Sequence, residues 1–506
     1  MKRSLLITFI LVCFTGSASA ATSTVFTEYQ AAASDQVENP YTALPGMPRE
    51  DRNAAPTLSG ISYEGATEVA ADPGQVLVGP ANDAASQSFN LTSGDGWTAL
   101  VNTSYTGDIN VQVTGTTKAT VFGAMGSGIA GRITLEIATT GEVGDAEFDR
   151  QAASIAGSHG GGCAAEFHVF VNGGSVTSDI VGGAVNGSGS IGAVHLVVNS
   201  GTVGGSLLGG SKTNGTVNAA TITINGGIVY GSIIAGGETG TVGNADVVIN
   251  GGSIAGDITR GDATRSEGAR ATVTVAGNKA YIGGNITADE VTLRDVNASG
   301  FSDGFDRYAG SITAEKLTLD NVQVDLKATL SVSSIELISS STSAELDENC
   351  RLNTLSLGSG STFSAHESPL TLTTLKAGTG AALNASIAFT AGASLILDGA
   401  LTMSRDVALV SGMSLTLSES MLADLYGYKA VTLFTGVDKL TLDNAVLVDG
   451  TTLSINGVFS NLDSGSDYTL AYVDGMVRLA VIPEPATATL NLLALAALAT
   501  RRRRKY

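Results

Sequence analysis

Hydrophobic and polar residues alternate along a segment that recurs several times between residues 168 and 290. Each copy is a short alternating run that ends at an Asn and continues into Gly. A period of two places the aliphatic side chains on one face of a β-strand, and no helical period fits them. The Asn residues that mark the four clearest copies are 27, 26 and 25 residues apart: Asn172, Asn199, Asn225 and Asn250.

The copies share four aliphatic positions, which lie one and three residues before the Asn and four and eight residues after it. A single copy cannot bury these side chains, but stacked copies join them into continuous apolar columns. Each buried Val, Ile or Leu then contributes about 1.5–3 kcal/mol. The pattern predicts an all-β fold, a parallel β-solenoid with a right-handed β-helix as the favoured form. An array of Gly-rich β-sandwiches is the alternative.

The Asn and Gly of each copy have separate roles in this prediction. Stacking brings the four Asn side chains above one another, so their amides are expected to form a ladder of hydrogen bonds between coils. The following Gly residues suit a corner that requires positive φ, a conformation that costs Gly little. We therefore expect a structural ladder at Asn172, Asn199, Asn225 and Asn250.

The composition extends the same architecture over most of the chain. With 64 Gly and only 5% aromatic residues, large aromatic cores are excluded, and many short strands are favoured. We expect a Gly-rich β-solenoid over residues 61–310, with an irregular stretch that lasts to about Glu166. A looser β-solenoid or β-rich subdomain is expected over 311–482. Residues 21–60 contain four Pro and are interpreted as an extended leader.

The two ends of the chain carry export signals. Residues 1–20 have a basic start, an apolar stretch and an A-x-A cleavage site, as in a secretory signal peptide. At the other end, uncharged residues 486–500 follow Pro483, Glu484 and Pro485. This stretch predicts a short transmembrane helix, and the basic cluster behind it is expected to stay cytoplasmic. The cluster begins with four consecutive arginines: Arg501, Arg502, Arg503 and Arg504.

The order Pro-Glu-Pro, apolar stretch and Arg cluster resembles the PEP-CTERM sorting signal of Gram-negative bacteria. The match covers residues 483–506 only. The resemblance implies that an exosortase, a membrane transpeptidase-like enzyme, recognises the tail. It also implies that the protein is anchored in the inner membrane before processing. Its destination would then be the cell envelope, the outer surface or an exopolysaccharide matrix.

The charge distribution restricts the possible partners. The formal net charge is −20, and part of the positive charge sits in the two ends. Nucleic acid is therefore not expected as a partner, because phosphate binding needs clustered Lys and Arg. Glycans or an exopolysaccharide are the partners that an exported, sparsely charged body suggests.

Constellations with the spacing of a catalytic or metal site are weak. We expect no catalytic residue, no metal site and no cofactor. His168 and His195 occupy one column on adjacent coils and are expected to stack at a solvent-facing position. The mature chain has two cysteines, Cys163 and Cys350, which lie far apart in sequence and are expected to remain free thiols.

A non-enzymatic surface or matrix protein with a structural or adhesive role is the leading hypothesis. The Gly-rich body is also similar to the passenger regions of autotransporter adhesins, although no translocator barrel is credible before the tail. The alternative is a β-helix polysaccharide lyase or glycoside hydrolase. Its candidate charged groups lie close together in the sequence: Asp257, Arg260, Asp262 and Arg265.

Overall fold

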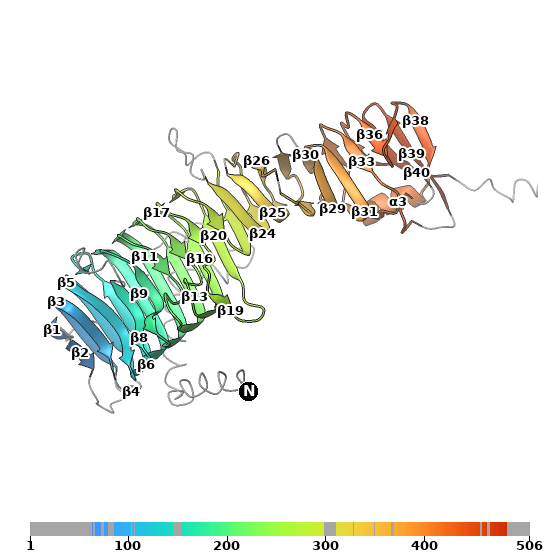
Figure 1. Ribbon diagram of the computed structural model, residues 1–506. Helices are drawn as coiled ribbons and strands as arrows, with labels where there is room; N and C mark the ends of the chain where they lie inside the picture. The colour runs from blue at the N-terminus through green and yellow to red at the C-terminus, as the bar shows by residue number, and fades with distance from the viewer. Residues whose placement is uncertain are drawn as a thin grey trace, which may run out of the picture. The chain divides into compact units, whose positions relative to one another are not determined.

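The computed structural model describes most of the chain between residues 63 and 482 (Figure 1). The gaps are 64–65, 72–74, 79–85, 103, 106, 145–153, 298–309, 327, 349, 366–368, 456–457 and 463–465. The expected signal peptide 1–20, leader 21–60 and sorting signal 483–506 lie outside the described residues. Within the described part, no helix combines the length and the apolar character that crossing a membrane requires.

The chain divides into two compact units between Glu315 and Lys316. The first unit contains only β-strands among its described residues. These strands, the last of which crosses the boundary, are β1 (Thr67–Ala71), β2 (Gln75–Val78), β3 (Gln87–Val101), β4 (Ser104–Tyr105), β5 (Ile109–Gly126), β6 (Ile129–Ile137), β7 (Glu142–Val143), β8 (Ile155–Gly160), β9 (Cys163–Val176), β10 (Ile180–Gly187), β11 (Ser190–Val203), β12 (Leu207–Leu208), β13 (Thr216–Ile224), β14 (Ile228–Val229), β15 (Ile233–Ile234), β16 (Thr241–Ile249), β17 (Gly252–Ile254), β18 (Ile258–Thr259), β19 (Thr264–Arg265), β20 (Ala271–Ala276), β21 (Ala280–Ile282), β22 (Ile286–Thr287), β23 (Glu290–Arg294) and β24 (Ser311–Asp320).

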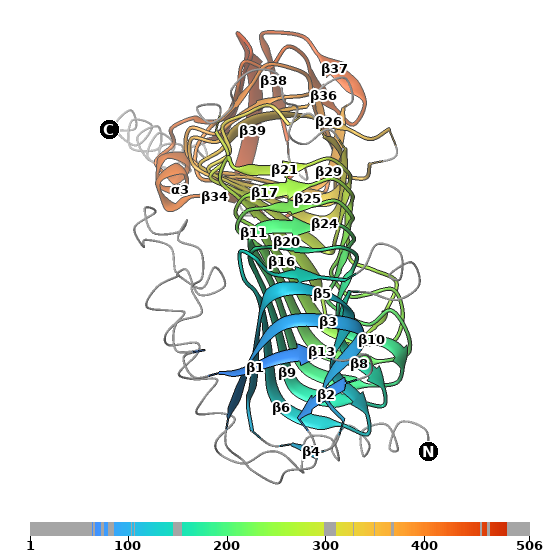
Figure 2. The same cartoon turned by 90° about the vertical axis from the view of Figure 1, so that its left-hand side faces the viewer.

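Strands of the first unit pair in parallel with the equivalent strand of the next coil. One ladder runs through β9, β11, β13, β16, β20 and β23. A second joins β11, β14, β17 and β21, and a third joins β8, β10, β12, β15, β18, β22 and β24. In Figure 2 the coils lie one behind another. This stack of parallel strands is consistent with a β-solenoid, and the β-sandwich alternative is wrong.

The four aliphatic columns form the interior of the stack, as the alternation predicts. All of their members between Val169 and Ala280 are at most 1% exposed. The column three residues before the Asn shows the arrangement, because its members are register partners on successive strands: Val169, Leu196, Ile222, Val247 and Val273.

The Gly residues after the Asn positions turn the chain with positive φ, as expected. Gly173 has a φ of 115°, and Gly201, Gly227 and Gly252 have values of 88°, 77° and 79°. Space is also restricted, since a Cβ on Gly201 would lie 2.1 Å from the carbonyl oxygen of Gly174. A larger residue at this corner would therefore strain the backbone and also collide with the preceding coil.

The expected irregular stretch before Glu166 is a correction in part. Residues 145–153 are outside the described part, but β8 begins at Ile155 and β9 at Cys163. Both strands belong to the parallel stack, where β8 pairs with β5 and β9 with β6. The prediction failed because Gly and Ala interrupt the aliphatic alternation here, while backbone pairing depends on neighbouring coils as well as on side chains.

The second unit is also a stack, and its coil is shorter. Ser334, Thr354, Thr374, Ser394 and Ser414 are successive register partners, so each coil has 20 residues. The spacing is therefore regular here, not loose as expected. The elements of this unit are β25 (Thr329–Ile338), β26 (Ser341–Leu346), β27 (Thr354–Leu357), β28 (Thr362–Ala365), β29 (Leu370–Ala377), β30 (Ala382–Asn384), β31 (Ile387–Leu397), β32 (Leu401–Met403), β33 (Val407–Leu409), β34 (Ser414–Leu417), α3 (Glu419–Tyr426), β35 (Val431–Thr435), β36 (Leu440–Leu442), β37 (Ala445–Leu447), β38 (Thr451–Ser454), β39 (Asp467–Val473) and β40 (Met476–Ile482).

The second unit ends in antiparallel strands and a short helix. β40 pairs antiparallel with β35 and β39, and β38 pairs antiparallel with β39. The helix α3 begins after Ser418, whose side chain accepts a hydrogen bond from the backbone N–H of Met421. Met421 and Leu425 are its buried residues. Antiparallel pairing gives the last coils hydrogen-bond partners without a further parallel coil.

Candidate functional site

The predicted Asn column forms a continuous chain of side-chain hydrogen bonds along the first unit. The Nδ2 atoms of Asn199, Asn225 and Asn250 each donate to the Oδ1 atom of the preceding Asn at 2.8 Å. At the other end, Asn172 Nδ2 donates to Glu136 Oε1 at 2.9 Å. These amides are half-buried, so each bond is partly shielded from water. We call this line from Glu136 to Asn250 the amide ladder.

Replacing Asn225 by Leu should destabilise the first unit, because Asn225 donates to Asn199 and accepts from Asn250. With two hydrogen bonds lost, we expect a decrease of about 1–3 kcal/mol in the free energy of unfolding. Urea denaturation followed by circular dichroism measures it. Asn218→Leu is the matched control, since Asn218 is exposed on the same coil. Equal losses in both variants would contradict a stabilising ladder.

A second ladder lies at another corner of the same stack, and the sequence reasoning missed it. Each side chain in this column accepts a hydrogen bond from the backbone N–H of the equivalent residue on the next coil, at 2.7–3.1 Å. A signal was present, because these residues directly precede the aliphatic column eight positions after the Asn. The members of this corner ladder are Asp179, Ser206, Ser232, Asp257, Asn285 and Ser311.

A buried group of charged and imidazole side chains lies nearer the start of the stack. Arg132 Nη2 and Asp108 Oδ2 form an ion pair at 2.8 Å, with both side chains less than 10% exposed. His168 Nε2 lies 3.4 Å from Glu166 Oε2. The rings of His168 and His195 meet edge to face, with centroids 4.6 Å apart. The expected stacking of the two histidines is therefore present.

The expected solvent-facing position of His168 is wrong, because the residue is fully buried. Burial and, second, the positive charge of Arg132 lower the pKa of His168 to about 3. Burial also raises the pKa values of Asp108 and Glu166 from their ordinary range, against the opposing effect of Arg132. Both shifts favour neutral side chains, so the group contributes to the packing of the stack rather than to a hydrated charged site.

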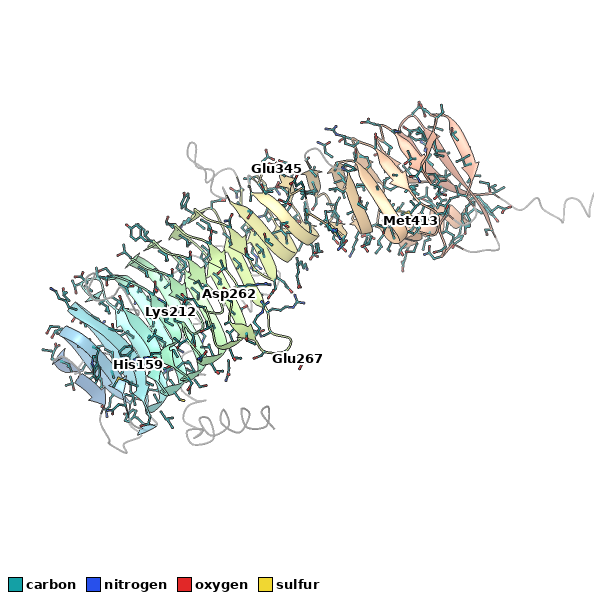
Figure 3. The ribbon with its side chains drawn as sticks, in the orientation of Figure 1. His159, Lys212, Asp262, Glu267, Glu345 and Met413 are labelled. Carbon is teal, nitrogen blue, oxygen red and sulfur yellow. The ribbon has the colours of Figure 1, made fainter. Side chains whose placement is uncertain are left out.

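The charged residues proposed for a lyase do not converge. Asp257 belongs to the corner ladder, and Asp262 is exposed. Arg260 and Arg265 both pair with the buried Asp289, which also accepts a hydrogen bond from the N–H of Ala271 at 2.7 Å. In Figure 3, the neighbouring Glu267 lies at the tip of the loop between β19 and β20.

The remaining candidate residues have less to add. Cys163 and Cys350 are both free thiols, as expected. Within the described ranges, no three His, Cys, Asp or Glu side chains are grouped as a metal site. The expected sorting residues Pro483, Glu484 and Pro485, and the four arginines from Arg501, fall outside the described part of the chain.

Comparisons with known proteins add no relative from which a function could be transferred. No protein-family model, no curated protein and no solved structure matches the chain. The resemblance of residues 483–506 to the PEP-CTERM signal therefore stays a prediction. The function has to be argued from the stack and its two ladders.

Proposed function

We propose that the chain is a non-enzymatic, exported surface or matrix protein with a structural or adhesive role. In this proposal its body is a right-handed parallel β-helix that presents a repetitive polar face to glycans or exopolysaccharide. The terminal segments support export: residues 1–20 as a signal peptide, and 483–506 as a tail that an exosortase processes. Residues 486–500 would hold the protein in the inner membrane before that step.

The amide ladder is the observation that carries the structural part of this proposal. It joins four coils through neutral side chains whose hydrogen-bonding atoms are directed along the stack. The corner ladder uses Asp257 in the same way. Side chains that bridge successive coils stabilise a long, regular surface, and such a surface suits repeated weak contacts with a polymer.

Purified residues 21–482 provide the test of the body. We expect binding to at least one glycan of a panel that includes polygalacturonate, alginate and dextran, with no new reducing ends or unsaturated products. Turnover of any of these polymers would overturn the non-enzymatic proposal. Fractionation of a native host with the full chain, or with residues 483–506 deleted, tests export. Identical location and mature mass would contradict the role of the tail.

A further inference from the structure

A trough of about 570 Å³ lies on the outer side of the second unit. Its floor includes Ala388, Ala408 and Thr441, which are register partners on β31, β33 and β36. The residues before them in the strands, among them Val407 and Leu440, are buried, so the three floor residues face outward. The face is hollow here because two of three successive outward positions carry only a methyl group.

Charged side chains line the same trough. Arg405 and Lys439 are both exposed, and neither has an ion-pair partner among the residues that the structure describes. Asp406 contributes a carboxylate to the lining. Elsewhere in this unit, Lys316 and Lys429 do pair with carboxylates, at 2.6 and 2.9 Å. Two unpaired cations in one hollow are therefore distinctive in a chain whose formal net charge is −20.

We propose that this trough binds a segment of an acidic polysaccharide. Arg405 and Lys439 would hold sugar carboxylates, since guanidinium and ammonium groups form charge-assisted hydrogen bonds with them. Asp406 would accept hydrogen bonds from sugar hydroxyls, and Thr441 would exchange them. The inference rests on the proposed function and narrows its glycan class to uronic-acid polymers.

The trough favours a polysaccharide over other macromolecules. Protein partners usually place large aromatic or aliphatic anchors in well-packed pockets, and Ala388 and Ala408 offer a shallow floor instead. Nucleic acid requires many phosphate contacts, which an acidic chain with two free cations at this site does not supply. A uronic-acid polymer needs fewer charges and many hydroxyl partners.

Affinity measurements on the full chain test the inference, with polygalacturonate as the acidic probe and dextran as the neutral one. We expect the double variant Arg405→Gln/Lys439→Gln to bind polygalacturonate about ten-fold or more weakly. Ala408→Trp, which fills the floor, should also weaken binding. Lys376→Gln is the control, because Lys376 is an exposed cation of the same unit outside the trough lining. Circular dichroism verifies that each variant is folded.

Each contrary outcome has a separate meaning. Unchanged binding in the double variant and in Ala408→Trp would overturn the trough while leaving adhesion elsewhere on the surface. A loss of the same size in Lys376→Gln would also overturn it, by indicating unspecific charge attraction. Binding of dextran but not polygalacturonate would reject the acidic ligand and retain the proposed function. Failure to bind any glycan would reject both.

Discussion

The variant Phe167→Ala should lower the free energy of unfolding of the first unit by about 3–5 kcal/mol. Phe167 is fully buried in the stack. Its ring lies against Gly123 and Gly157, where an added Cβ would approach ring carbons to 3.1 and 3.2 Å. These glycines leave the space that the ring fills. Truncation therefore removes apolar contact and leaves a cavity that a rigid backbone cannot close.

Chemical denaturation followed by circular dichroism measures this loss, and Tyr230→Ala is the matched control. Tyr230 is an aromatic residue of the same unit but is 59% exposed, so its truncation should change stability by less than about 1 kcal/mol. Phe167→Leu should fall between the two, because it retains most of the buried volume. Similar losses for Phe167→Ala and Tyr230→Ala would contradict the assigned core.

Acidification from pH 6.5 to pH 4.5 should destabilise the first unit by roughly 2–3 kcal/mol through His168. The ordinary histidine pKa is 6.5, whereas burial lowers the pKa of His168 to about 3 in the folded chain. Between these values the unfolded chain binds a proton that the folded chain does not. Stability from this group is therefore complete above pH 6.5 and decreases as the pH falls through that window.

The carboxyl groups near His168 act in the opposite direction. The pKa values of Asp108 and Glu166 are raised in the folded state, so the folded chain binds their protons first and their contribution to stability grows on acidification. Comparison with His168→Gln separates the two effects. His195 also has a pKa lowered to about 3, by burial first and then by His168. It retains some solvent access, so the prediction rests on the fully buried His168.

Denaturation curves at pH 7.5, 6.5, 5.5 and 4.5 provide the measurement. The difference in stability between the wild type and His168→Gln should change with pH, and the slope should approach about 1.4 kcal/mol per pH unit below pH 6. The control His159→Gln changes a histidine that is outside this buried group and should keep the wild-type slope. A pH-independent difference for His168→Gln would mean that its imidazole titrates normally in the folded chain.

The repeat in the first unit was predictable because three local signals coincide on every coil. The period of two selects the buried positions, as Ile222 and Ile224 illustrate, and Gly227 marks the corner. Asn225 has the side chain that a ladder requires. The 20-residue coil of the second unit was also written in the sequence, through recurring pairs such as Leu355 and Leu357. It was missed because its corners lack a shared Asn-Gly marker.

The candidate site was less predictable, because it depends on what lies beside a residue on other coils. Asp257 has the sequence context of a surface charge, but its neighbours above and below make it part of the corner ladder. His168 alternates with core residues and was assigned to solvent, yet it is buried. The trough at Ala408 needs outward alanines of separate coils to meet. Each of these cases requires the register between coils, which a single strand does not contain.

Taken alone, the sequence determined the strand type, the inward positions and the glycine corners, because these follow from the geometry of one strand and one turn. The tertiary structure alone decided which side chains meet across coils, and therefore which charges are paired, which imidazole is buried and where the surface is hollow. The reason is physical: backbone conformation is a local property, whereas burial and charge pairing depend on contacts between residues about 20 to 27 positions apart.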